Sequence, residues 1–154
     1  MTTGLAIAEA DAGSAEAAGL IAALDAELEE RYPGLTIHGI EAEGFRESGG
    51  VFLLGRVEGV AVACGAIRPL GGGVAEVKRM FVVRQHRGRG HSRAMLAALE
   101  GAAAARGFRR IRLETGIRQP EAIGLYESAG YLAIPCYEEF IEDPRSRCFE
   151  KALG

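Results

Sequence analysis

A strand, a glycine-containing loop and a helix follow one another at residues 74–106. Residues 74–83 are largely apolar and β-branched, which predicts a buried strand. The loop at 84–90 contains two glycines and several arginines. The residues after it are rich in alanine, carry apolar side chains at helical spacing and stop at Gly107, a residue type common just after a helix. The pattern predicts a helix that begins near Gly90.

This loop is predicted to bind a phosphate-bearing ligand. Glycines let the backbone approach a ligand closely, and a helix start directs its free N–H groups and positive dipole end toward an anion. Four arginines crowd this helix start, where the macrodipole disfavours cations: Arg84, Arg87, Arg89 and Arg93. A bound anion would relieve that conflict. The alternative is a solvated, arginine-rich helix entry.

The spacing Gln85-x-x-Gly88-x-Gly90 between a strand and a helix resembles the acetyl-CoA pyrophosphate loop of the Gcn5-related N-acetyltransferase (GNAT) superfamily. It differs from a P-loop because no Gly-Lys-Ser/Thr follows, and from a Rossmann fingerprint because the third glycine is absent. One strand downstream, residues 119–131 read Gln-Pro-Glu-Ala-Ile-Gly-Leu-Tyr-Glu-Ser-Ala-Gly-Tyr. They are similar to the family signature Asn-x-x-Ala-x-x-Leu-Tyr-x-x-x-Gly-Phe. Two motifs in the expected order strengthen the resemblance.

Two departures from the family pattern stand out. Gln119 takes the place of the common Asn, which keeps the amide but lengthens the side chain. His91 and Ser92 replace the usual Ile-Gly or Ile-Ala pair, which makes the first helical turn bulkier.

The resemblance implies a donor site for acetyl-CoA. It implies that the strand before the loop splays from its neighbour and pairs through its backbone with the pantetheine arm, and that the loop holds the pyrophosphate. The residues expected to contact the donor are Met80, Phe81, Val82, Val83, Gln85, Arg87, Gly88, Arg89, Gly90, His91, Ser92, Gln119 and Tyr126.

The resemblance also supplies catalytic candidates. Tyr126 matches the family tyrosine that lies near the CoA sulfur and protonates the leaving thiolate. Glu76 is the first candidate for the base that removes the proton of the amine, and Glu114 on the next strand is the second. Proton loss to solvent without a dedicated base is a further alternative. Glu76 and Lys78 lie on one strand face and could instead form an ion pair.

Two segments bear on the acceptor. By resemblance, residues 32–45 help form its pocket. The acidic stretch Glu138, Glu139, Glu142 and Asp143 could attract a cationic substrate, although such runs are usually solvated loops.

The remaining segments indicate the fold. Residues 51–56 and 60–67 predict an antiparallel hairpin, and Pro69–Gly73 a loop. The strand at 109–115 follows a helix, which predicts a parallel pair with a crossover. We therefore expect one α/β domain over 1–154: the GNAT fold, with a mixed, mostly antiparallel sheet of six to seven strands and helices on both faces.

Composition limits the alternatives. The chain has 154 residues, of which 48% are hydrophobic and 25% charged, which suits one globular core. A net charge of −3 argues against a nucleic-acid binder. The lack of a long apolar run and of a signal pattern argues against a membrane partner and predicts a cytoplasmic protein. Three cysteines without metal-ligand spacing predict reduced thiols and no metal.

We expect an N-acetyltransferase that transfers the acetyl group of acetyl-CoA directly to a primary amine of a small molecule or peptide, in a ternary complex. A homodimer is compatible with this function. Two other classes stay open. The chain could sense acyl-CoA without turning it over, or it could use the arginines at 84–93 to bind nucleic acid or a phosphoprotein.

Overall fold

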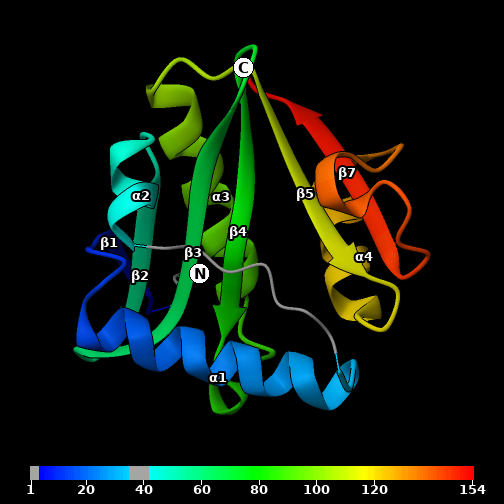
Figure 1. The fold of residues 1–154 in the computed structure, drawn as a ribbon. Helices are drawn as coiled ribbons and strands as arrows, with labels where there is room; N and C mark the ends of the chain where they lie inside the picture. The colour runs from blue at the N-terminus through cyan, green and yellow to red at the C-terminus, as the bar shows by residue number, and fades with distance from the viewer. Residues whose placement is uncertain (1–3, 35–41) are drawn as a thin grey trace.

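Seven strands form one mixed sheet in this protein, whose computed structural model describes residues 4–34 and 42–154 (Figure 1). The strand order is β1-β2-β3-β4-β5-β7-β6. Neighbouring strands are antiparallel except for β4 and β5, which are parallel. The expected mixed, mostly antiparallel α/β sheet is confirmed.

The elements alternate along the chain. The strands are β1 (Ala6–Glu9), β2 (Val51–Val57), β3 (Val60–Gly71), β4 (Val74–Val82), β5 (Arg110–Gly116), β6 (Leu132–Ile134) and β7 (Ser146–Ala152). The helices are α1 (Ala15–Arg31), α2 (Ala42–Glu47), α3 (His91–Ala105) and α4 (Pro120–Ser128), with short 3-10 turns η1 (Arg84–His86) and η2 (Glu138–Phe140). Among the described helices, none is long and apolar enough to cross a membrane.

Local sequence explains several of these boundaries. The side chain of Ser14 accepts a hydrogen bond from the N–H of Ala17 and so caps the start of α1. Pro120 stands in the first turn of α4, where its missing N–H costs nothing. The hairpin between β2 and β3 turns through Glu58 and Gly59, both with positive φ, as a tight two-residue turn requires.

Helices cover both faces of the sheet. Side chains alternate between the faces along a strand. Leu53 of β2 joins a core cluster with Leu96 and Leu99 of α3, whereas Phe52 and Leu54 pack in a second cluster with α1. The two clusters therefore fix α3 and α4 on one face, and α1 and α2 on the other.

Two local predictions were wrong in part. The loop expected at Pro69–Gly73 is shorter, because β3 continues to Gly71 and Pro69 pairs in register with Ala75 of β4. The turn expected at residues 46–50 is present at 48–49, but α2 extends to Glu47 and takes up the first two of these residues. Half of the segment 32–45 that was expected to help form the acceptor pocket, residues 35–41, lies outside the described residues.

The parallel pair β4–β5 opens soon after it begins. The paired residues are Val74–Arg110, Ala75–Ile111 and Glu76–Arg112, although both strands continue beyond them. Figure 1 shows β4 and β5 diverging from this closed end. The splay implied by the resemblance is present.

A bulge in β4 accompanies the opening. Cys64 of β3 pairs with Phe81, whereas Ala66 pairs with Lys78, so β4 holds one residue more than β3 over this stretch. Arg79, inside the bulge, has a φ of 57°, an uncommon value for a residue other than glycine. A bulge bends its strand and increases the local twist, which turns β4 away from β5.

We predict that Gly65→Ala, opposite this bulge, lowers the free energy of unfolding by about 1–3 kcal/mol. An added Cβ would lie 2.7 Å from Cδ1 of the buried Leu99. The control is Gly101→Ala within α3, where an added Cβ meets no atom within 4 Å. It should stabilise the helix by about 0.5–1 kcal/mol. Urea denaturation of both variants measures the difference, and equal stabilities would contradict the prediction.

Candidate active site

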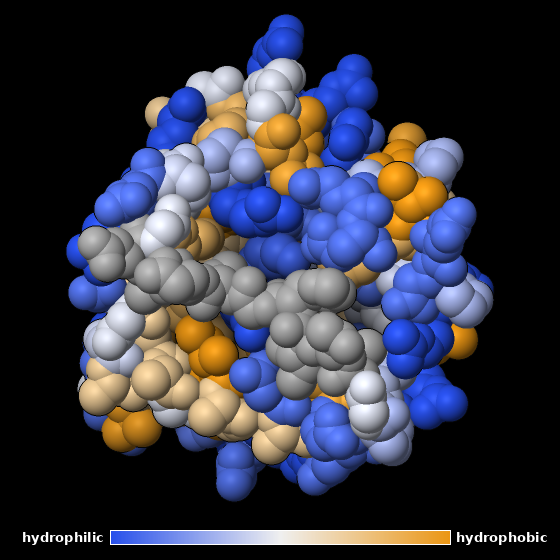
Figure 2. Space-filling model, in the orientation of Figure 1, coloured by the Kyte–Doolittle hydropathy of each residue, from blue (hydrophilic) through white to orange (hydrophobic). Residues whose placement is uncertain are grey.

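A cleft of about 300 Å³ lies where β4 and β5 diverge. β4 contributes residues 77–80 and β5 residues 113–116. The other lining residues come from α1, α4 and the segment before β7: Leu24, Leu28, Tyr32, Gly34, Gln119, Tyr126, Phe140, Asp143, Arg145 and Ser146. Hydrophilic side chains gather near the middle of the face shown in Figure 2. The cleft thus joins an unpaired length of β4 to polar groups on β5 and β7.

The glycine loop leads into α3 at the end of β4. Gly88 and Gly90 have φ values of 77° and 82°, which explains why glycine stands at both positions. Gly90 is the N-cap of α3, no side chain caps this helix, and its first turn holds no acidic residue. An added Cβ at Gly88 would meet no atom within 4 Å. The helix begins where it was predicted to begin, and its uncapped start offers free N–H groups to an anion.

The arginines of this region divide into two kinds. Arg84 and Arg87 donate hydrogen bonds to Glu27 of α1 at 3.2 and 2.8 Å, and Arg87 also donates to the carbonyl of Val82. These ion pairs tie the loop to α1. Glu27 thus balances the positive charge of Arg84 and Arg87, which a bound anion was expected to balance. Arg89 has a long contact of 3.5 Å with the ring of His86. Arg89 thus keeps most of its donors for a ligand.

His91 begins α3 and is almost fully buried, with 2% of its surface exposed. Its Nδ1 has no hydrogen-bond partner among the described residues. Burial lowers the pKa of its imidazole, and the nearby His86 and Arg89 lower it further. A neutral His91 therefore fills the first helical turn beside the loop.

Tyr126 projects from α4 into the cleft lining and is buried. Its ring packs near those of Tyr131 and Phe149 at centroid distances of 5.8 and 6.2 Å. Burial raises the pKa of its phenol well above the usual range, so the group keeps its proton at neutral pH. The residue predicted as the general acid can donate a proton from this position.

Glu76 is buried at the closed end of the β4–β5 pair, with 1% of its surface exposed. Its carboxylate accepts hydrogen bonds from Nε of Arg68 at 2.7 Å and from the hydroxyl of Tyr137 at 2.8 Å, and Nζ of Lys78 lies at 3.9 Å. It is not among the residues that line the cleft. The expected pairing of Glu76 with Lys78 is present, and the carboxylate is fully engaged.

Glu114 of β5 lines the cleft directly. The hydroxyl of Ser146 donates to its carboxylate at 2.8 Å, and no ion pair to it is found among residues 4–34 and 42–154. Burial raises the pKa of this carboxyl group, and the ammonium of Lys78 partly offsets the effect. The geometry therefore favours the second base candidate over the first.

Gln119 and Tyr32 meet at the wide end of the cleft. The amide oxygen of Gln119 accepts from the N–H of Gly116 at 3.2 Å, so this signature side chain holds the turn between β5 and α4. The hydroxyl of Tyr32 accepts from the N–H of Arg118 at 2.9 Å. A Cβ at Gly116 would lie 1.8 Å from that hydroxyl, which explains the glycine. Tyr32 connects the end of α1 to the far side of the cleft.

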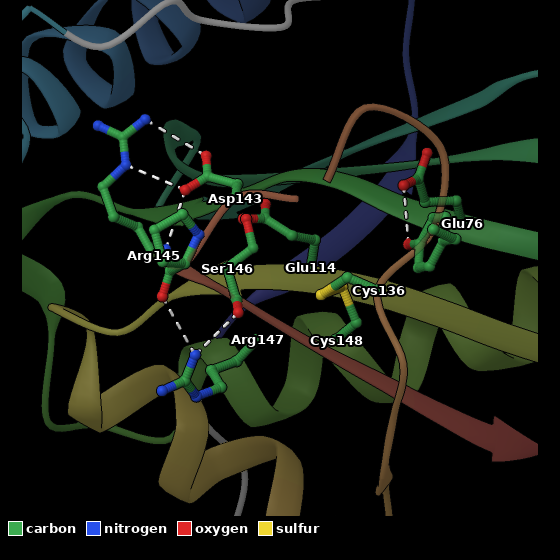
Figure 3. The surroundings of a disulfide bond; sticks show 10 residues. Glu76, Glu114, Cys136, Asp143, Arg145, Ser146, Arg147 and Cys148 are labelled. Carbon is green, nitrogen blue, oxygen red and sulfur yellow. Dashed lines mark hydrogen bonds and ion pairs between the residues drawn. A yellow bond between two sulfur atoms is a disulfide. The ribbon is translucent and has the colours of Figure 1, made fainter. Parts of the chain in front are cut away.

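Ion pairs neutralise most of the acidic stretch at 138–143. Glu138 contacts Arg68 at 3.3 Å, and Glu139 contacts Lys78 at 3.8 Å. The two carboxylate oxygens of Asp143 accept hydrogen bonds from Nε and Nη2 of Arg145 at 3.1 and 3.3 Å (Figure 3). Of the four, Asp143 lines the cleft. No sequence motif marked Phe140, Arg145 or Ser146. Their position in the cleft depends on the pairing of β7 with the distant strand β5, which no local pattern reveals.

Cys136 and Cys148 form a disulfide beside the cleft (Figure 3), so the prediction that all three cysteines are reduced was wrong. Their Cα atoms lie 5.2 Å apart because β6 and β7 pair up to Ile134 and Cys148. Cys64 is free and buried. Burial raises the pKa of its thiol to about 12, which makes it unreactive.

A splayed parallel pair, a bulged central strand and an open glycine loop at a helix start define an acyl-CoA N-acyltransferase fold. The sequence profile of the acetyltransferase (GNAT) family matches residues 18–131. The chain belongs to this family, and it is an acetyl-CoA-dependent acetyltransferase.

Known proteins agree with this assignment. An IAA acetyltransferase from Azospirillum brasilense is 36% identical over 135 residues, which cover 87% of this chain and 88% of that protein. A Klebsiella pneumoniae protein assigned as an acyl-CoA N-acyltransferase has a structure that matches with a TM-score of 0.85 at 35% identity, over 99% of this chain and 100% of that one. A GNAT family acetyltransferase from Elizabethkingia anophelis, solved with acetyl-CoA bound, shares the fold with a TM-score of 0.73 at 17% identity, over 99% and 100% of the two chains.

We predict that Gly88→Ala raises the KM for acetyl-CoA by about tenfold or more, because its Cβ would occupy the open face of the loop. The matched control is Gly59→Ala in the β2–β3 turn. Both glycines have a φ near 80° and no atom within 4 Å of an added Cβ, so the two variants carry similar backbone strain. Steady-state kinetics measures the two KM values. An equal change in both variants would show that strain, and not donor binding, is responsible.

Proposed function

We propose that the protein transfers the acetyl group of acetyl-CoA to a primary amine by direct attack in a ternary complex. The cleft carries this proposal, because it joins the unpaired length of β4 to Glu114 and Tyr126 on the opposite side. An amine and a thioester could meet between these walls. Cys64 is buried and unreactive, which argues against an acyl-cysteine route through that thiol.

β4 and the glycine loop hold the donor in this proposal. Beyond Glu76, β4 has no β5 partner, so the backbone groups from Met80 to Val83 that do not already pair with β3 can pair with the extended pantetheine arm. Its N–H groups would also stabilise the oxyanion that forms on the thioester carbonyl. The loop from Gly88 to Ser92 would receive the pyrophosphate at the start of α3.

Glu114 is the general base of this proposal and Tyr126 the general acid. A carboxyl group whose pKa is raised by burial takes up a proton more readily at neutral pH than a solvated one does. The phenol of Tyr126 keeps its proton and can give it to the leaving thiolate. Glu76 has a structural role in this proposal, because its carboxylate already accepts hydrogen bonds from Arg68 and Tyr137.

The acceptor proposed here is a primary amine with an apolar body. Leu24 and Leu28 of α1 and the ring of Phe140 offer apolar surface in the cleft. Lys78, Arg79 and Arg145 are paired with carboxylates, which reduces their ability to bind an anionic acceptor. The cytoplasmic location and the homodimer stay predictions from the sequence.

The proposal predicts a distinct pH dependence. Because the base must be ionised, kcat/KM should rise with pH through the raised pKa of Glu114 and level off above it. Glu114→Gln should lower kcat/KM by about 100- to 10,000-fold and remove this acid limb. Tyr126→Phe should lower kcat with little effect on acetyl-CoA binding. CoA release from acetyl-CoA with a panel of primary amines measures these rates.

Glu76→Gln is the control, because it keeps the size of the side chain at the rival base. It should lower stability and leave the acid limb in place. Loss of the limb in Glu76→Gln but not in Glu114→Gln would reverse the assignment of the base. Tight binding of acetyl-CoA without CoA release for any amine would support the non-catalytic sensor instead.

A further inference from the structure

The disulfide Cys136–Cys148 lies at the base of a wall of the cleft. β6 pairs with β7 as far as Ile134 and Cys148, and Pro135 then interrupts the ladder because it has no N–H to donate. Just beyond the end of this ladder, the disulfide links Cys136 covalently to Cys148 of β7. The chain then leaves β7 and returns to it at Ser146. The segment 137–145 is therefore a loop closed by the disulfide.

This loop supplies the side of the cleft that faces the acceptor. Phe140, Asp143 and Arg145 line the cleft, and Tyr137 donates a hydrogen bond to Glu76. Figure 3 draws the disulfide together with Glu114 and with Asp143 and Arg145 of the loop. A change at the disulfide thus acts on the acceptor side of the site.

Side chains attach the first half of the loop to the sheet: the hydroxyl of Tyr137 donates to Glu76 at 2.8 Å, and the buried ring of Phe140 lies 5.4 Å from Nζ of Lys78. The ion pairs Arg68–Glu138 and Lys78–Glu139 have separations of 3.3 and 3.8 Å and partly exposed partners, so each contributes little. The second half is held through its backbone, because the N–H of Ile117 donates to the carbonyl of Arg145 at 2.8 Å. Loss of the disulfide would therefore loosen residues 137–141 most.

We propose that Cys136–Cys148 is a thiol–disulfide exchange site that controls acceptor binding; this inference rests on the proposed function. A low-molecular-weight thiolate attacks the sulfur of Cys136, which is more exposed than that of Cys148, and the Cys136–Cys148 bond breaks. Cys148 leaves as a thiolate, and Cys136 is left in a mixed disulfide with the small thiol. A second small thiolate then attacks the small-molecule sulfur of this mixed disulfide and releases the thiolate of Cys136. Two small thiols become one small disulfide as the protein gains two thiols, and a small oxidised disulfide reverses both steps.

The third cysteine cannot take part in this exchange. Cys64 packs in the cluster under α1, its thiol donates to the carbonyl of Arg79 at 3.2 Å, and its pKa is raised to about 12. The donor side is also separate, since Arg87 and Glu27 hold the glycine loop to α1. Reduction should therefore change the KM for the acceptor and leave acetyl-CoA binding almost unchanged.

The experiment uses the full chain in glutathione buffers of defined ratio. Thiol titration after denaturation should find one free thiol in the oxidised protein and three in the reduced protein. Reduction should raise the acceptor KM by about tenfold, with the Kd of acetyl-CoA within about twofold. Cys136→Ser should behave like the reduced protein in either buffer, and the control Cys64→Ser, which keeps a donor for the carbonyl of Arg79, should keep the full response.

Two outcomes would overturn the inference: three free thiols in the oxidised buffer, or an acceptor KM that is the same in both redox states. Failure of the proposed function looks different, because no amine would then release CoA in either state. In that case hydrogen exchange still tests whether the disulfide holds residues 137–141 in place. Faster exchange of the amides at 137–141 after reduction supports it, and unchanged exchange contradicts it.

Discussion

The early divergence of β4 from β5 is the constraint on which the site depends. A parallel pair that stayed together beyond Glu76 and Arg112 would fill the cleft with its own ladder. The bulge at Arg79 prevents this, and its left-handed φ carries a cost of about 1–3 kcal/mol. The partly buried ion pair of Arg79 with Asp25, at 2.5 Å, and the hydrogen bond from Cys64 to the Arg79 carbonyl hold the strained residue in place. Packing elsewhere in the fold thus maintains an unpaired strand edge.

Helix α1 connects the separate parts of the site. Asp25 holds the bulge, and Glu27 holds the donor loop through Arg84 and Arg87. At its end, Arg31 pairs with Glu121 at the start of α4. One helix therefore sets the positions of the bulged strand, the loop and the β5–α4 turn. A shift of α1 would alter the donor side and the acceptor side together.

Patterns that are local in the sequence predicted most of the fold. The loop at Gly88 and Gly90 and the signature around Tyr126 depend on neighbouring residues, and both lie where the motifs indicated. Contacts between distant segments could not be predicted in this way. The ranking of Glu76 above Glu114 reversed once Arg68, Tyr137 and the cleft were placed in space. The disulfide depends on the register of β6 with β7, which no spacing of cysteines reveals.

The most direct test of this account is amide hydrogen exchange along β4, measured with and without acetyl-CoA. If the donor arm pairs with the free edge of β4, the amides between Val77 and Val83 that face the cleft should exchange more slowly in the complex. The edge strand β1, on the far side of the sheet, should be unchanged. Binding of acetyl-CoA that leaves β4 unprotected would contradict the claim that the splayed strand is the donor site.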